Sequence, residues 1–130
     1  MILLDTHVWW WAISEPEKLS SVAVETINKS PSDQRFIAAI SLWEFAMMVK
    51  KKRIILNMSP KDWFTHAIDN VGTKVIPLSG EIALESCNLS GNFHKDPADR
   101  IIVATARIHN VLLVTKDQKI LDYPDVISCW

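Results

Sequence analysis

The sequence predicts an α/β fold built on a parallel β-sheet. Short, continuous runs of apolar residues, such as residues 1–4 and 111–115, alternate along the chain with longer segments whose apolar residues recur at helical spacing. The run at residues 1–4 is apolar at every position, which is typical of a strand that is covered on both faces. Strands that alternate with helices in this way form parallel sheets with right-handed crossovers.

Composition and charge narrow the class of protein further. The 130 residues are 48% hydrophobic, include three glycines and carry a net charge of −1. A chain of this length buries a substantial core, and this hydrophobic content excludes a disordered protein. Because the net charge is close to zero, any contact with nucleic acid must depend on a local basic surface. We expect residues 1–130 to form a single domain.

The expected location of the protein is the cytoplasm. The N-terminal segment reaches Asp5 without a basic region, which is unlike a signal peptide. The longest early apolar run, residues 8–13, is far too short to span a membrane. Cys87 and Cys129 are isolated, lack the spacing of zinc ligands and suit a reducing compartment.

The first half of the chain is predicted to contain two strands. The first strand, over residues 1–4, leads into a short helix that includes three consecutive tryptophans at positions 9–11. Three neighbouring tryptophans cannot all face one core, so we expect at least one at a surface that a partner or second subunit covers; internal packing of all three is the alternative. An amphipathic helix over residues 20–29 precedes the second strand, at residues 36–40.

Prolines and glycines mark the elements of the next segment. Ser59 and Pro60 are typical of a helix start, and Gly72 is typical of a helix end. The following strand, over residues 74–78, contains a proline, which favours a position at the edge of the sheet. A further helix is expected over residues 80–90.

The last part of the chain combines a strong helix start with two strands. Asp96 is a good N-cap residue, and Pro97 suits the first helical position. The apolar helix that follows should be buried and should end at Asn110. Strands over residues 111–115 and about 126–128 complete the predicted sheet.

Four acidic residues are expected at one edge of this sheet. Asp5 follows the first strand, and Asp117 follows the strand over residues 111–115. Glu44 lies one helical turn beyond the second strand, and Asp99 lies in the first turn of the buried helix. Because ligands of parallel α/β sheets bind outside the carboxyl ends of the strands, these acids are candidates for a shared site.

Each acid also has a purely structural explanation. Asp99 can favour the positive end of the helix dipole, and Asp117 can be a turn residue. Ser41 and Glu44 match the Ser-x-x-Glu capping box that opens many helices. Asp96 is first of all a cap. The case for a site therefore depends on convergence of the four acids.

If the four acids converge in the fold, they would indicate a binding site for a divalent cation. Clustered carboxylates repel one another and raise each other's pKa unless a cation compensates. Oxygen ligands without histidine or cysteine favour Mg²⁺ or Mn²⁺ over zinc. Such an ion can activate a water molecule and polarise a phosphate. Thr6 and Thr115, each next to one of the acids, are candidates to orient ligands or waters by hydrogen bonds.

Four motifs together resemble those of the PIN-domain family, and in particular its VapC-type toxins of bacterial toxin–antitoxin pairs. They are Leu-Asp-Thr-His at residues 4–7, Ile-Ser-Leu-Trp-Glu at 40–44, His-Lys-Asp-Pro-Ala-Asp-Arg at 94–100 and Thr-Lys-Asp at 115–117. The resemblance extends over essentially the whole chain. One departure is Ala98, where many relatives carry a bulky residue. The resemblance implies a three-layer α/β/α sandwich with a mostly parallel five-stranded sheet.

The resemblance also implies an activity, a site and partners. It implies a Mg²⁺- or Mn²⁺-dependent endoribonuclease that hydrolyses RNA and leaves a 5′-phosphate. Asp5, Glu44, Asp99 and Asp117 would form the catalytic and metal-binding set, with Asp96 as a further acid near the site. A homodimer and an inhibitory cognate antitoxin, which often places a basic residue in the acidic pocket, are expected. No membrane association is expected.

Candidates for RNA contact are Lys50, Lys51, Lys52, Arg53 and Arg100. The first four form the dense basic run of the sequence, and contacts from such residues to the RNA backbone would not read its sequence. The alternative for the run is that its charges simply favour a helix C-terminus through the dipole.

Two other classes of function are weighed against a nuclease. A receiver-like signalling domain, which accepts a phosphoryl group on an aspartate, is also a small parallel α/β protein with acids at strand ends. It would carry paired acids after the first strand, where this chain has Asp5 alone, and an aspartate after its third strand, where residues 75–78 have none. The second alternative is a catalytically inactive PIN-like binding module.

Overall fold

A five-stranded parallel sheet forms the centre of the computed structural model, which describes residues 1–130 apart from the side chain of Asn70. The strand order is β3-β2-β1-β4-β5, and every pair of neighbours is parallel. The strands are β1 (Ile2–Leu4), β2 (Arg35–Ala38), β3 (Lys74–Ile76), β4 (Leu112–Val114) and β5 (Ser128–Cys129). The predicted α/β class is confirmed.

The positions of β1 and β3 match their sequence patterns. β1 is buried at every residue and pairs with β2 on one side and β4 on the other. The prediction that the first strand is covered on both faces is therefore confirmed. β3 lies at the edge of the sheet, as the proline that follows it indicated, because a proline has no N–H for a second neighbour.

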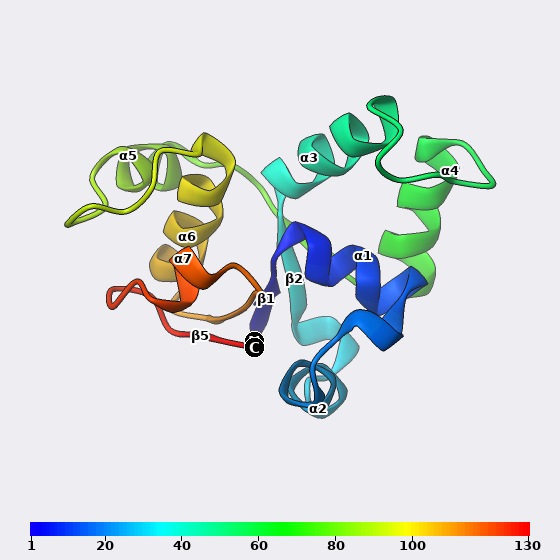
Figure 1. Ribbon diagram of the computed structural model, residues 1–130, viewed down its shortest axis with the longest axis horizontal. Coiled ribbons are helices and arrows are strands. Elements are labelled where there is room, and N and C mark those ends of the chain that lie inside the picture. The colour runs from blue at the N-terminus through cyan, green and yellow to red at the C-terminus, as the bar shows by residue number, and fades with distance from the viewer.

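Helices cover both faces of the sheet (Figure 1). One layer contains α1 (Thr6–Ser14), α2 (Ser21–Lys29), α3 (Ala39–Lys50) and α4 (Pro60–Thr65), and the other contains α5 (Gly80–Cys87), α6 (Pro97–His109) and α7 (Gln118–Leu121). Short turns of helix at η1 (Pro16–Lys18), η2 (Ser32–Gln34) and η3 (His66–Asn70) complete the set. The result is the three-layer sandwich that the family resemblance implied.

Side chains of the central strands alternate between two apolar cores. Leu3 packs in the core under α5 and α6, together with Ile102, whereas Ile2 and Leu4 pack in the core under α1 to α4, together with Trp9. Successive side chains of a strand point to opposite faces, so a central strand that is apolar throughout contributes to both cores. This burial stabilises the sheet edge at which the acidic residues lie.

α6 is built as the sequence predicts. Asp96 accepts hydrogen bonds from the backbone N–H groups of Ala98 and Asp99, at 2.9 and 3.3 Å, and Pro97 is the first helical residue. Asn110 ends the helix in the left-handed conformation, with φ of 51°, which asparagine tolerates better than most residues. The helix is therefore held at both ends, and its first turn is fixed in place.

Two helix starts differ from the sequence prediction. α3 begins at Ala39, two residues before the expected cap, and its N-cap residue makes no side-chain hydrogen bond. Ser41 thus lies inside the helix, and the capping-box interpretation of Ser41 and Glu44 is wrong. α7 was not predicted, because four residues are too few to show a helical period.

The three tryptophans of α1 have different surroundings. Trp9 is fully buried and packs edge-on against Trp63 at a ring-centroid distance of 4.9 Å. Trp10 and Trp11 are half-buried. The expectation that the three cannot all enter the core is confirmed, and whether a partner covers the other two stays a prediction. Among the described residues, no helix combines the length and apolar character needed to cross a membrane.

Candidate active site

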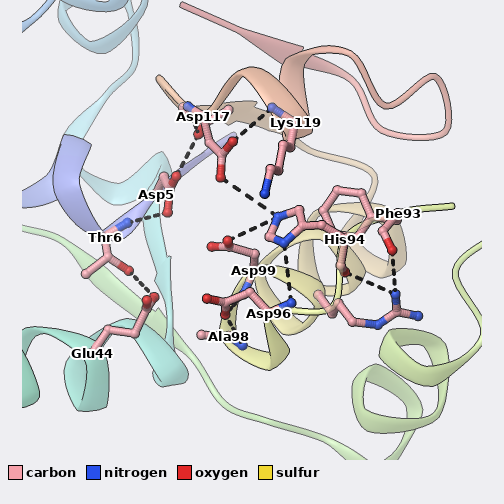
Figure 2. Close-up of polar contacts among 12 residues, drawn as sticks. Asp5, Thr6, Glu44, Phe93, His94, Asp96, Ala98, Asp99, Asp117 and Lys119 are labelled. Carbon is pink, nitrogen blue, oxygen red and sulfur yellow. Dashed lines mark hydrogen bonds and ion pairs between the residues drawn. The ribbon is translucent and has the colours of Figure 1, made fainter.

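The four predicted acids line one pocket at the carboxyl edge of the sheet. Asp5 follows β1, Glu44 comes from α3, Asp99 from the first turn of α6, and Asp117 follows β4; Figure 2 shows their side chains pointing toward a common space. The pocket has a volume of about 540 Å³. Segments far apart in the sequence thus place carboxylates together, as the position of strand ends in a parallel sheet predicts.

Asp5 is held firmly by both of its carboxylate oxygens. Oδ1 accepts a hydrogen bond from the backbone N–H of Thr6 at 2.7 Å, and Oδ2 accepts one from Thr115 Oγ1 at 2.6 Å. Burial raises the pKa of this carboxyl, while the hydrogen bonds from Thr115 and Thr6 act in the opposite direction. The residue as a whole is 9% exposed, so the position of its side chain is fixed by contacts with the protein.

Glu44 is positioned by the side-chain hydroxyl of Thr6, whose backbone N–H holds Asp5. Thr6 Oγ1 donates to Glu44 Oε1 at 2.7 Å and lies 2.9 Å from Ser41 Oγ, so a buried hydroxyl pair joins the start of α1 to α3. Burial is the main cause that raises the pKa of Glu44, and the nearby carboxylates of Asp5 and Asp96 add to it. The contact with Thr6 replaces the capping role that the sequence pattern suggested.

Asp117 and Asp96 combine a capping role with a place in the pocket. Asp117 Oδ1 accepts from the backbone N–H of Lys119 at 2.9 Å and so caps α7, while its own N–H donates to Thr115 Oγ1 at 3.0 Å. Asp96 caps α6 and lines the same pocket. Both residues therefore cap a helix, and this hydrogen bonding fixes the orientation of a carboxylate at the site.

Asp99 has the most strongly perturbed carboxyl of the pocket. Its pKa rises from 3.8 to about 8, first because it is desolvated and then because Asp5, Asp96, Glu44 and Asp117 surround it with negative charge. The side chain is 19% exposed. Asp99 therefore retains a proton near neutral pH in the absence of a compensating cation, which is the electrostatic signature of a site built for one.

His94 is a residue at the site to which the sequence analysis gave no role. Its Nε2 lies 3.2 Å from Asp99 Oδ2 and 3.9 Å from Asp117 Oδ2, and its Nδ1 accepts the backbone N–H of Asp96 at 3.3 Å. The Nε2 atom is buried but makes no well-aligned hydrogen bond. One ligand atom from each of His94, Asp99 and Asp117 lies within 4.8 Å of the others. A nitrogen donor therefore lies beside the predicted oxygen ligands, and the identity of the ligands stays a prediction.

A lysine also lines the pocket. Lys116 lies next to Asp117 in the sequence, and its Nζ is 5.5 Å from the ring centroid of Trp11. The segment after β4 thus brings a positively charged side chain into the pocket that Asp5 and Glu44 line.

The predicted RNA-contacting residues lie elsewhere. Lys50 ends α3, and the rest of the basic run is exposed beyond that end; none of the four residues lines the acidic pocket. Arg100 donates from Nε to Ser86 O at 2.8 Å and from Nη1 to Phe93 O and His94 O at 3.2 and 3.3 Å. Arg100 thus fastens α5 and the loop before α6 to that helix, and its contact with RNA stays a prediction.

Known proteins resemble this chain over nearly its full length. The family model described as PIN domain matches residues 2–126. Ribonuclease VapC22 of Mycobacterium tuberculosis is 34% identical over 131 residues, which cover 99% of this chain and 98% of that protein.

Solved structures with the same fold come from toxin–antitoxin complexes. A toxin–antitoxin complex from Klebsiella pneumoniae gives a TM-score of 0.68 at 23% identity, covering 98% of this chain and 96% of that one. VapBC2 from Rickettsia felis, bound to a DNA fragment from its promoter, gives 0.71 at 19% identity, with 99% and 98% covered.

Proposed function

Because this chain belongs to the PIN-domain family, we propose that it is an endoribonuclease that hydrolyses RNA phosphodiester bonds and is the toxin of a toxin–antitoxin pair. The observation that carries the proposal is the convergence of Asp5, Glu44, Asp99 and Asp117 in one pocket. A receiver-like domain is excluded by the family. A catalytically inactive binding module is the remaining alternative, and cleavage of RNA distinguishes the two.

The donor set of the pocket fits a divalent cation. Carboxylates from four segments face one another, and the pKa of Asp99 is raised to about 8. We assign Asp5, Glu44, Asp99 and Asp117 as the residues that hold Mg²⁺ or Mn²⁺, directly or through water. The nearby nitrogen of His94 favours Mn²⁺ of the two, because imidazole is a softer donor than a carboxylate. When bound, the ion would supply charge compensation and water activation.

The residues of the chain have distinct tasks in this scheme. Thr6 and Thr115 fix the two oxygens of Asp5 before substrate arrives, so little reorganisation is needed during the reaction. The hydrogen bond from Thr6 uses one oxygen of Glu44, and we assign to the other oxygen the orientation of the attacking water. Asp99 gives up its proton when positive charge enters the pocket.

The same proposal implies an oligomeric state, a protein partner and a cellular location. We expect a homodimer, an antitoxin that places a basic side chain in the acidic pocket, and a single PIN-like domain over residues 1–130 that works in the cytoplasm. Relatives with this fold were solved as toxin–antitoxin complexes. Lys50, Lys51, Lys52 and Arg53 are proposed to contact the RNA backbone outside the pocket.

The test is RNA cleavage by purified, antitoxin-free protein. A mixed pool of tRNA and mRNA is incubated with Mg²⁺, with Mn²⁺ or with EDTA, alongside the variants Asp99→Asn and Asp33→Asn. Asp33 is an exposed acid outside the pocket and serves as the matched control. Discrete, metal-dependent products from the wild type and the control, but not from Asp99→Asn, support the nuclease. A folded protein that binds Mn²⁺ but cuts no RNA would favour the inactive binding module.

A further inference from the structure

The acidic pocket has a second wall of different chemistry. Trp11, His7 and Lys116 line the same pocket as the carboxylates. Trp11 lies six residues after Asp5 on the helix that Asp5 caps, which corresponds to about 9 Å along the helix axis. Both side chains nevertheless border the same space, because Asp5 and Trp11 line one pocket. A phosphate held at the carboxylates would therefore place an adjacent base near Trp11.

Trp11 contributes less to the packing of the protein than its two neighbours do. Trp9 is fully buried, and Trp10 donates its indole N–H to Glu15 at 2.8 Å. Trp11 stays half-buried, and its ring meets His7 and Trp130 in tilted contacts at centroid distances of 5.6 and 6.0 Å. The surrounding rings fix the orientation of the indole while leaving part of it open to the pocket.

The ammonium group of Lys116 lies over the indole of Trp11, in a position that a substrate base can take. The Nζ of Lys116, an exposed side chain, lies 5.5 Å from the Trp11 ring centroid. Such a cation–π contact is worth only about 0.5–1 kcal/mol at an exposed site. Stacking of a nucleic acid base on an aromatic side chain is worth about 1–3 kcal/mol. A base can therefore displace the ammonium group, which then becomes available to a phosphate.

We propose that Trp11 is the platform of a nucleobase subsite beside the acidic site, and that Lys116 binds the phosphate that flanks the stacked base. This inference rests on the proposed ribonuclease function and adds a specific substrate contact to it. RNA is favoured over a protein segment as the occupant, because the ring and the ammonium group open into the cavity in which a phosphodiester must bind. Stacking on one indole tolerates any base, so the subsite positions RNA without selecting its sequence.

The experiment compares two probes in a cleavage-deficient background. Asp99→Asn protein is titrated into a short fluorescein-labelled single-stranded RNA of mixed sequence, and into the same RNA with abasic nucleotides. Adding Trp11→Leu should weaken binding of the complete RNA about 5- to 150-fold and leave binding of the abasic RNA within about twofold. Trp43→Leu is the matched control, because Trp43 is 58% exposed on α3 and does not line the pocket.

Further measurements separate stacking from damage to the fold. Trp11→Phe should restore part of the affinity, and Lys116→Met should reduce the slope of log affinity against log salt by about one. Equal losses for complete and abasic RNA, or no loss for either, would overturn the subsite. An unchanged affinity for RNA together with weaker inhibition by the antitoxin would identify Trp11 as a protein contact and would also overturn it. Absence of cleavage by the wild-type protein would instead contradict the ribonuclease function itself.

Discussion

The proton on Asp99 makes the stability of the metal-free protein depend on pH. In the folded state the pKa of Asp99 is about 8, compared with 3.8 for an unperturbed aspartate. Between these values the folded protein keeps a proton that the unfolded chain has lost. The free energy of unfolding must therefore fall as pH rises through this window. Below about pH 4 both states are protonated, and the penalty for burying the charge disappears.

The size of the effect can be estimated from the same pKa. A pKa difference of one corresponds to 1.36 kcal/mol, which gives an upper limit of about 6 kcal/mol for Asp99. Solvent reaches part of the pocket and screens the carboxylates, so we expect roughly 2–3 kcal/mol. Replacing Asp99 with asparagine removes the titrating group while keeping a side chain of similar size.

Urea unfolding followed by tryptophan fluorescence measures this directly. In the presence of EDTA, the wild type should lose roughly 2–3 kcal/mol between about pH 5 and pH 8. Asp99→Asn should keep a much smaller slope, caused by Asp5 and Glu44, whose pKa values are also raised by burial. Addition of Mn²⁺ at the higher pH should restore stability to the wild type and to Asp33→Asn, but not to Asp99→Asn. Parallel pH profiles for the wild type and Asp99→Asn would refute the reasoning, and Asp33→Asn controls for a general effect of charge.

Three further changes test other parts of the structure. Thr115→Val removes a buried hydroxyl that bonds to the carboxylate after β1; calorimetry should show a 10- to 100-fold loss in Mn²⁺ affinity, whereas Thr115→Ser should bind normally. Arg100→Met leaves three backbone carbonyls without their donor and should lower the free energy of unfolding by about 2–3 kcal/mol, while the salt dependence of RNA binding stays the same. Replacement of Lys50, Lys51 and Lys52 by alanine should reduce the slope of log affinity against log salt by about three; an unchanged slope would mean that the run is only a helix end.

The layout of the acids could be predicted from the sequence because it depends on strand order and little else. Apolar runs locate the strands, and the carboxyl ends of parallel strands meet at one edge. Asp5 and Asp117 follow directly from that rule, and the Asp96–Pro97 start places Asp99 in the first turn of α6. These signals are local, so they can be recognised in the sequence without knowledge of the tertiary contacts.

Other parts of the site depend on contacts between distant segments and could not be predicted. The Ser41–Glu44 spacing has two physical explanations, and the buried hydroxyl of Thr6 decides between them. The position of His94 follows from how the loop before α6 folds back toward Asp117. Arg100 lies in the middle of a recognisable motif, yet its partners are carbonyls whose positions no sequence pattern reveals.

The central position of β1 determines when the acidic pocket can first exist. During synthesis β1 precedes its neighbour β4, and Asp5 precedes the hydroxyl that holds it, by 110 residues. A growing chain that ends before β4 has no Thr115 and no Asp117, so the Asp5 carboxylate lacks one of its two hydrogen bonds and the pocket lacks one of its acids. The acidic pocket is consequently complete only after synthesis has passed Asp117, and chains that stop earlier lack part of it.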